Sequence, residues 1–282
     1  MIRLFCLIFI LFVTSTTTAA EHPKATKPIT IIVNNWSSQI VLSHITGTLF
    51  KHLGYNVIYN NAPVDEQWGL LRFGMGDVQV EVWEGTMAKE FNRFIELGFF
   101  LDAGAHSART REEWWYPAYV KELCPGLPSW KALNQCAHLF ATDETQPRGR
   151  YLAGPWEKPD RARIRALALN FSKVQADDAS ALWSVFEEAV SRKQPILLFN
   201  WTPNWVEHIH DGEFVEFPEW DIRCETDASW GLNPAFTYDC GNPKMAGLKK
   251  LLQHQCHKPG LVLLSYLNAS TSTMRCWLSL QL

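Results

Sequence analysis

The sequence predicts an α/β protein whose sheets are mostly parallel. A β-branched run at residues 29–33 is followed by a helix-like segment and by a second extended segment at residues 55–59. A strand, a helix and a strand joined by short connections form a βαβ unit, in which the two strands are parallel. The same order of elements recurs in the second half of the chain. The 282 residues are 47% hydrophobic, which supplies a sizeable core.

The first 20 residues show the three-part pattern of a secretory signal peptide. Arg3 supplies a positive charge, residues 4–13 are an apolar run, and small residues lead up to Ala20. The apolar run is shorter than the roughly 20 residues that a membrane-spanning helix needs. We therefore expect residues 1–20 to be removed and the mature protein to work in the periplasm.

The first strand, at residues 29–33, ends just before Trp36. Ser37 or Ser38 can cap the helix that follows, and Gly54 can end it. Apolar residues in this helix recur every four positions, at Val41, Ile45, Leu49 and Leu53.

Later segments repeat these patterns. Residues 77–83 alternate valines with polar residues and predict a strand that ends on Trp83. Residues 161–169 and 178–192 predict helices, and residues 195–200 predict a strand that runs into Trp201. Residues 251–282 show little periodicity and predict no element.

Cysteine spacing suggests two disulfides. Seven cysteines become six once Cys6 leaves with the signal peptide, and an even number in an oxidising compartment favours pairing. The near neighbours in sequence are Cys124 with Cys136 and Cys224 with Cys240. In the chain-entropy model, each disulfide would stabilise the folded protein by roughly 3 kcal/mol. Zinc binding is the competing interpretation, but the chain has no CxxC pair.

The 13 tryptophans are the most unusual feature of the composition. Trp36, Trp83 and Trp201 each follow or end a predicted strand. In open α/β sheets, ligands bind outside the carboxyl ends of the strands, so these three side chains could line one cleft. Indole faces attract cations, above all a quaternary ammonium, which offers no proton for hydrogen bonding.

Three segments carry a resemblance to a known family. Residues 80–86 around Trp83, the Gly154-Pro155-Trp156 turn, and residues 199–205 with their Trp-Thr-Pro-Asn-Trp core resemble the glycine betaine/choline-type substrate-binding proteins of ABC transporters. The resemblance runs from about residue 30 to residue 244.

This resemblance implies a two-lobed periplasmic-binding-protein fold of type II-like topology, each lobe a mixed, mostly parallel sheet flanked by helices. Lobe one would comprise residues 28–112 and 206–282, and lobe two residues 113–205. The chain would cross between the lobes near residues 111–119 and 205–212.

The resemblance also implies the site residues. Tryptophans matching Trp83, Trp156 and Trp201 enclose the ammonium methyl groups, and some choline-type members use a tryptophan at the place of Trp36 and an aromatic residue near Tyr116. Two positions depart from the family pattern: Ser38 stands where choline-type members have an aspartate, and Met87 stands where some betaine binders have a histidine. Without that histidine, a betaine carboxylate is left to backbone N–H groups or to Ser38.

We expect the protein to capture glycine betaine or a related quaternary ammonium compound for import through an ABC transporter permease in the inner membrane. We expect a monomer without a cofactor. We also expect no metal site, since His208 and His210 lack a third ligand nearby. A formal net charge of −3 argues against nucleic-acid binding.

Two other functions remain open. Tryptophan platforms also stack on sugar rings, and Glu84 and Glu157 lie beside Trp83 and Trp156, so a secreted carbohydrate-active enzyme with paired carboxylates is one alternative. A sensor domain of the same fold is the other.

Overall fold

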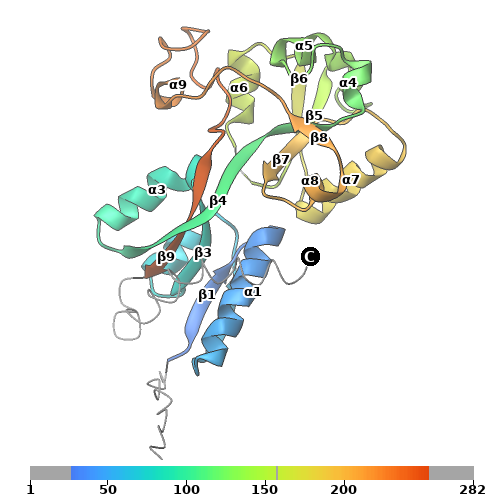
Figure 1. Ribbon diagram of the computed structural model, residues 1–282. Helices are drawn as coiled ribbons and strands as arrows, with labels where there is room; N and C mark the ends of the chain where they lie inside the picture. Colours follow the sequence, from blue (N-terminus) through green and yellow to red (C-terminus); the bar gives the residue numbers. More distant parts are fainter. Residues whose placement is uncertain (1–26, 157, 254–282) are drawn as a thin grey trace, which may run out of the picture.

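The computed structural model describes residues 27–156 and 158–253, which form two lobes (Figure 1). The expected signal peptide at residues 1–20, Glu157 and the tail from residue 254 to residue 282 lie outside these residues. Each lobe contains a mixed sheet with helices packed against it, which confirms the predicted α/β class.

The first lobe has a sheet with the strand order β2-β1-β3-β9-β4. Strand β1 is parallel to β2 and β3, whereas β9 is antiparallel to β3 and β4. The elements of this lobe are β1 (Ile29–Val33), α1 (Ser37–His52), β2 (Val57–Asn61), α2 (Gln67–Arg72), β3 (Val78–Trp83), α3 (Glu84–Glu96), the first part of β4 (Phe100–Pro117), and β9 (Ala246–Gln253).

The second lobe has the strand order β4-β7-β5-β6, with β8 also paired to β4. Strand β5 is parallel to β6 and β7, whereas β4 is antiparallel to β7 and β8. Its elements are α4 (Val120–Leu123), α5 (Trp130–Gln135), the 3-10 helix η1 (Ala137–Phe140), β5 (Gly149–Ala153), α6 (Asp160–Ala166), β6 (Phe171–Gln175), α7 (Ala179–Ser191), β7 (Leu198–Thr202), α8 (Val206–Ile209), β8 (Gly212–Phe214) and α9 (Ile222–Thr226).

The long strand β4 runs through both lobes (Figure 1). It pairs with β9 up to Thr110 and with β7 from Arg111 onward. The chain returns to the first lobe only at β9, which is later in the sequence than the crossing expected near residues 205–212. Strand β8 still pairs with residues 115–117 of β4, which keeps the chain in the second lobe until after Asn242.

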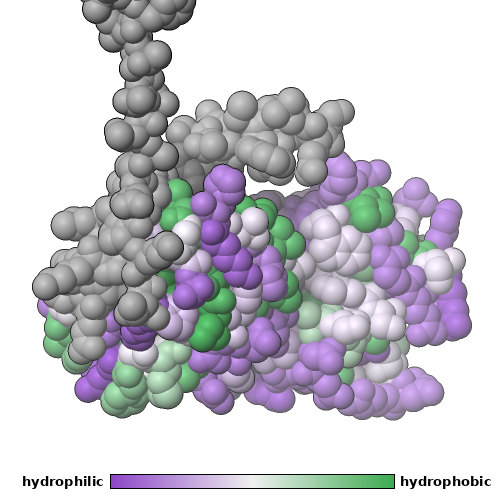
Figure 2. All heavy atoms as spheres, turned by 90° about the horizontal axis from the view of Figure 1, so that it is seen from below, coloured by the Kyte–Doolittle hydropathy of each residue, from purple (hydrophilic) through white to green (hydrophobic). Residues whose placement is uncertain are grey.

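Helix α1 is confirmed, but three of the four apolar residues that predict it are exposed, and only Leu53 packs against the core. Val41, Ile45 and Leu49 are 55%, 42% and 47% exposed. Figure 2, viewed from the side on which α1 lies in Figure 1, shows hydrophobic residues among hydrophilic ones on this face. The buried residues of α1 are Gln39, Ser43, Thr46, Gly47 and Phe50.

Polar contacts explain this orientation of α1. The Gln39 side-chain amide donates to the Ile32 carbonyl at 2.8 Å, so hydrogen bonds as well as apolar area hold the helix on the sheet. Neither predicted serine caps the helix with its side chain, because Trp36 occupies the N-cap position without a side-chain bond.

Both predicted disulfides are formed. Cys124 is bonded to Cys136, and Cys224 to Cys240. The predicted helices of the second half appear as α6 and α7, and the predicted strand appears as β7.

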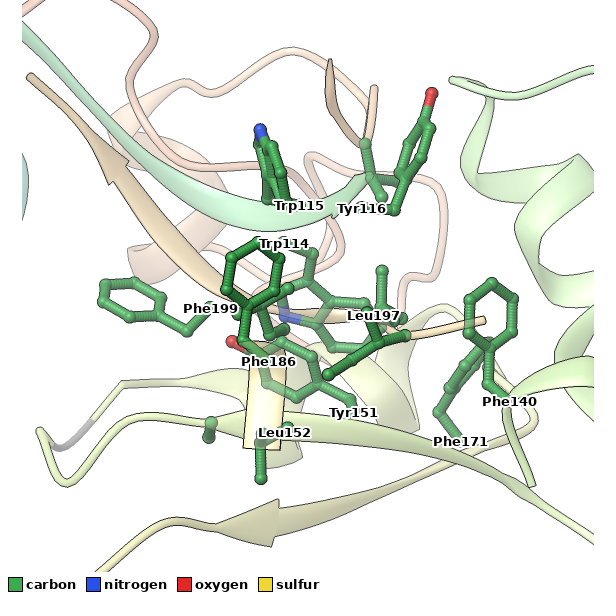
Figure 3. Close-up of a cluster of buried hydrophobic side chains, with 14 of the residues drawn as sticks. Trp114, Trp115, Tyr116, Phe140, Tyr151, Leu152, Phe171, Phe186, Leu197 and Phe199 are labelled. Carbon is green, nitrogen blue, oxygen red and sulfur yellow. The ribbon is translucent and has the colours of Figure 1, made fainter. Parts of the chain in front are cut away.

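The core of the second lobe is rich in aromatic rings (Figure 3). Trp114 stacks on Tyr151 with ring centroids 3.9 Å apart, and its edge meets Phe171 and Phe217. Among the described residues, no helix has the length and apolar character needed to cross a membrane.

Candidate functional site

A cavity of about 400 Å³ lies where the two lobes meet. The first lobe contributes residues from the ends of β1 and β3 and from α2 and α3, and the second lobe contributes residues after β5 and on β7. The lining residues are Trp36, Val64, Asp65, Trp68, Trp83, Thr86, Met87, Glu90, Glu112, Trp156, Lys158, Phe199 and Trp201.

Four of the predicted tryptophans line this cavity together. Trp36 follows β1, Trp83 ends β3, Trp156 follows β5 and Trp201 lies on β7. The indole ring of Trp156 is edge-on to that of Trp36, with centroids 6.3 Å apart, and to that of Trp201, with centroids 5.1 Å apart. The carboxyl-end rule for parallel strands therefore explains why tryptophans distant in sequence line one cavity.

The two tryptophans of the first lobe are anchored by one carboxylate. The Nε1 atoms of Trp36 and Trp83 donate to Oε1 of Glu81 at 2.6 and 2.8 Å. Ser38 Oγ donates to the same oxygen at 2.8 Å. Glu81 is fully buried, and burial is the main cause that raises the pKa of its carboxyl, while the three hydrogen bonds oppose that shift.

A buried amide network continues below Glu81. Gln79 Nε2 donates to Asn34 Oδ1 at 2.7 Å and to Gln67 Oε1 at 2.6 Å, and the backbone N–H of Glu81 donates to Gln79 Oε1. Gln39 Nε2 also donates to Gln79 Oε1 at 3.0 Å. These mutual bonds hold the side chains behind Glu81 in one arrangement, since a buried polar group without a partner is costly.

Trp156 bridges the lobes. Its Nε1 donates to Asn35 Oδ1 at 2.9 Å, and these two residues belong to different lobes. Gly154 makes room for the ring, because a Cβ at that position would lie 2.5 Å from Cε3 of Trp156. The described arrangement is thus one in which both lobes touch across the cavity.

The charged groups in the cavity lining are mostly acidic. Asp65, Glu90 and Glu112 are carboxylates, and Lys158 is the basic side chain of the lining. Lys158 pairs with Glu112 and lies 5.3 Å from the centroid of Phe199. Thr86 Oγ1 donates to Glu112 at 3.1 Å. An aromatic cavity with excess acid favours a cationic ligand group.

The segments that cross between the lobes are joined beside the cavity. Arg163 contacts the Glu113 carboxylate at 2.5 Å, and the Asn242 backbone N–H donates to the other oxygen at 2.8 Å. Burial raises the pKa of Glu113, against the opposing effect of Arg163. Asn242 Nδ2 also donates to the Glu112 carbonyl at 2.7 Å, so strand β4 is tied to the chain that leads into β9.

Two of the predicted ligand residues do not line the cavity. Ser38 is bonded to Glu81 instead. Tyr116 is buried in the core of the second lobe, and its hydroxyl donates to Glu213 at 3.4 Å (Figure 3). The choline-type aromatic position assigned to Tyr116 is therefore not part of this cavity.

Several lining residues are absent from the predicted set. Trp68 lines the cavity and also stacks on Phe94 and Phe100. Phe199 was visible as part of the segment at residues 199–205 that carries the family resemblance. Glu112 and Lys158 are brought together by the fold alone, since 46 positions separate them.

Comparisons with known proteins agree with this geometry. Residues 27–251 match the family described as the substrate-binding domain of ABC-type glycine betaine transport systems. A trimethylamine N-oxide-binding protein of Pelagibacter ubique (strain HTCC1062) is 37% identical over 213 residues, covering 71% of this chain and 67% of that protein.

Solved structures share the fold. The glycine betaine/L-proline-binding protein ProX of Borrelia burgdorferi superposes with a TM-score of 0.60 at 17% identity, covering 82% of this chain and 76% of ProX. Lactococcal OpuAC in its closed form with glycine betaine gives a TM-score of 0.58 at 13% identity, covering 82% of this chain and 79% of OpuAC. These likenesses confirm the two-lobed architecture. Members of the matched family are extracytoplasmic solute receptors and not enzymes. The chain described here belongs to the family of substrate-binding proteins of ABC-type glycine betaine transport systems.

Proposed function

We propose that this protein captures a small solute that combines a trimethylated nitrogen with a nearby anionic oxygen, and delivers it to the permease of an ABC transporter. Glycine betaine and trimethylamine N-oxide both have this chemistry. The observation that carries the proposal is the set of four indole rings, two from each lobe, around one cavity.

The energetics of such a cage are adequate for a receptor. Each ring in contact with a desolvated methylated ammonium contributes about 0.5–2 kcal/mol, so four rings supply roughly 2–8 kcal/mol before costs. Micromolar affinity requires about 8 kcal/mol net. A second anchoring group is therefore needed, and an anionic oxygen on the ligand would meet that need.

Two groups near the cavity suit an anionic oxygen. Lys158 carries a positive charge into the lining. The indole Nε1 of Trp201 is buried and has no hydrogen-bond partner within the described part of the chain. A ligand oxygen that accepts from either group would offset the cost of burying that donor.

The family and the N-terminal pattern support a proposal for the cellular setting. We infer a periplasmic location after removal of residues 1–20, a monomeric state, and a role in osmoprotection when glycine betaine is the cargo. Closure of the lobes on the ligand would present a single shape to the permease, because burying the methyl groups between rings of both lobes favours the closed state.

Isothermal titration calorimetry with glycine betaine, trimethylamine N-oxide and choline tests the proposal. We expect binding of at least one of the first two compounds, and weaker binding of choline, which has no anionic oxygen. Trp83→Ala and Trp201→Ala should each weaken binding by about 1–2 kcal/mol or more through lost cation–π contact. Trp130→Ala, outside the cavity, serves as the control. Absence of heat and of any thermal shift with all three compounds at millimolar concentration would rule out the proposal.

A further inference from the structure

The cavity has a buried carboxylate behind it that the ligand cannot touch directly. Glu81 does not line the cavity and is fully buried, yet it holds two of the four rings that do. One of its oxygens accepts three hydrogen bonds, from Trp36, Ser38 and Trp83, at 2.6–2.8 Å. Each of these three hydrogen bonds lowers the pKa of the Glu81 carboxyl and so favours its ionised form, against the opposing effect of burial.

Within the described part of the chain, no cationic side chain forms an ion pair with Glu81. The other Glu81 oxygen, Oε2, is buried without a hydrogen-bond partner within residues 27–156 and 158–253. The charged group that acts on it is another carboxylate, Glu112. A buried and uncompensated charge costs free energy, and a structure retains one only when something offsets that cost.

The geometry points to Glu81 as a positioning and specificity-determining residue: its carboxylate fixes the Trp36 and Trp83 rings and supplies, from behind them, the negative charge that makes the cavity select a cationic head over a neutral one of the same shape. This inference rests on the proposed function.

Two physical effects act in the same direction. An indole whose N–H donates to an anion is polarised toward greater electron density, which strengthens its attraction for a cation at the ring face. The carboxylate charge itself also reaches the cation through a low-dielectric interior, where charge interactions are only weakly screened. Burial raises the pKa of the Glu81 carboxyl, which means that it disfavours the charged form, and a bound cation would favour that form.

The test compares glycine betaine with 3,3-dimethylbutanoate, in which carbon replaces the ammonium nitrogen and the carboxylate is kept. For the wild-type protein we expect glycine betaine to bind at least about tenfold more tightly. In Glu81→Gln we expect the affinity for glycine betaine to fall about tenfold or more while the affinity for 3,3-dimethylbutanoate changes about threefold or less, so that the preference collapses.

Two further variants separate charge from packing. Ser38→Ala removes one hydrogen bond to the same oxygen but no charge, and it should leave the preference ratio intact. Glu81→Asp keeps the charge and shortens the side chain, so both ligands should bind less well while the preference for glycine betaine survives. Equal losses for the two ligands in Glu81→Gln would show a purely structural role and overturn the inference.

A measurement on the wild-type protein covers the case in which Glu81→Gln does not fold. Difference infrared spectra of the complex with glycine betaine, with ¹³C-labelled glutamate, should show no band of a buried protonated carboxyl at neutral pH. Such a band, absent from Glu81→Asp, would refute the inference even without the glutamine variant. If the wild-type protein binds glycine betaine and 3,3-dimethylbutanoate equally, this inference fails alone; if it binds no methylated ammonium compound, the proposed function fails as well.

Discussion

The hydrogen bond between Trp156 and Asn35 allows closure to be tested apart from ligand contact. Asn35 does not line the cavity, so Asn35→Ala leaves every ligand contact in place. It removes only the acceptor for the Trp156 indole N–H, which lies 2.9 Å away across the lobe boundary. A bond that forms only when the lobes meet stabilises the closed state and thereby raises ligand affinity.

The magnitude follows from the type of bond. A neutral hydrogen bond contributes about 0.5–1.5 kcal/mol net, and the exposure of Asn35 places this one toward the lower end. The dissociation constant for glycine betaine should therefore rise about two- to tenfold in Asn35→Ala. The change should appear mainly in the dissociation rate, measured by stopped-flow tryptophan fluorescence with a competing ligand, because the open protein that meets the ligand is unaltered.

A double-mutant cycle sharpens the assay. Trp156→Phe keeps an aromatic ring but removes the donor, so the effects of Asn35→Ala and Trp156→Phe should be less than additive by about 0.5 kcal/mol or more. Asn92→Ala, on the exposed face of α3, is the matched control and should bind like the wild type. Full additivity, or an unchanged dissociation rate in Asn35→Ala, would mean that the bond does not contribute to closure.

Three other outcomes are expected. Gly154→Ala should weaken glycine betaine binding roughly fivefold or more in calorimetry. The added Cβ would displace the Trp156 ring, and overpacking of this kind costs about 1–3 kcal/mol. An affinity equal to that of the wild type would contradict the close approach of Gly154 and Trp156. Replacing both Cys124 and Cys136 by serine should lower the free energy of unfolding without changing ligand affinity. The chain-entropy model gives a loss of roughly 3 kcal/mol, which urea titrations can measure. An unchanged midpoint of urea unfolding would argue that the disulfide is not formed in the native protein. His106 is largely buried and bonds the Val80 carbonyl, and burial, with a smaller effect of Lys250, lowers its pKa below the ordinary 6.5. The unfolded chain therefore binds more protons than the folded one just below pH 6.5, so the stability that His106 contributes is present above that pH and is lost as the pH falls. His106→Gln should flatten this part of the stability profile in thermal melts, and a profile of unchanged slope would exclude His106 as its source.

The four tryptophans that line the cavity were predictable because their positions depend on local sequence. Trp36, Trp83 and Trp201 follow from recognising where a β-branched or apolar strand ends, and Trp156 follows from a Gly-Pro turn that resembles the family. Strand ends converge at one edge of a parallel sheet whatever the details of packing. The same local argument paired the cysteines correctly, since short loops bring neighbours within bonding distance.

The residues that escaped prediction depend on contacts between distant segments. Glu81 looks like the polar member of an alternating strand, and nothing in the residues around it indicates that Trp36 would donate to it from 45 positions away. The pairing of Glu112 with Lys158 has the same origin. The buried face of helix α1 could not be predicted for a related reason. Its polar residues face the sheet because Gln39 completes the amide network of Gln79, and the periodicity of apolar residues does not reveal such a contact.

The anchoring of Trp36 and Trp83 to Glu81 has a consequence for the order of events during capture. Both rings and their carboxylate belong to one lobe, so half of the cage persists when the lobes separate. An arriving solute is expected to land first on this preassembled surface, and the rings of the other lobe then swing over it. Encounter rates should accordingly be insensitive to changes in Trp156 and Trp201, whereas the lifetime of the complex should depend on them.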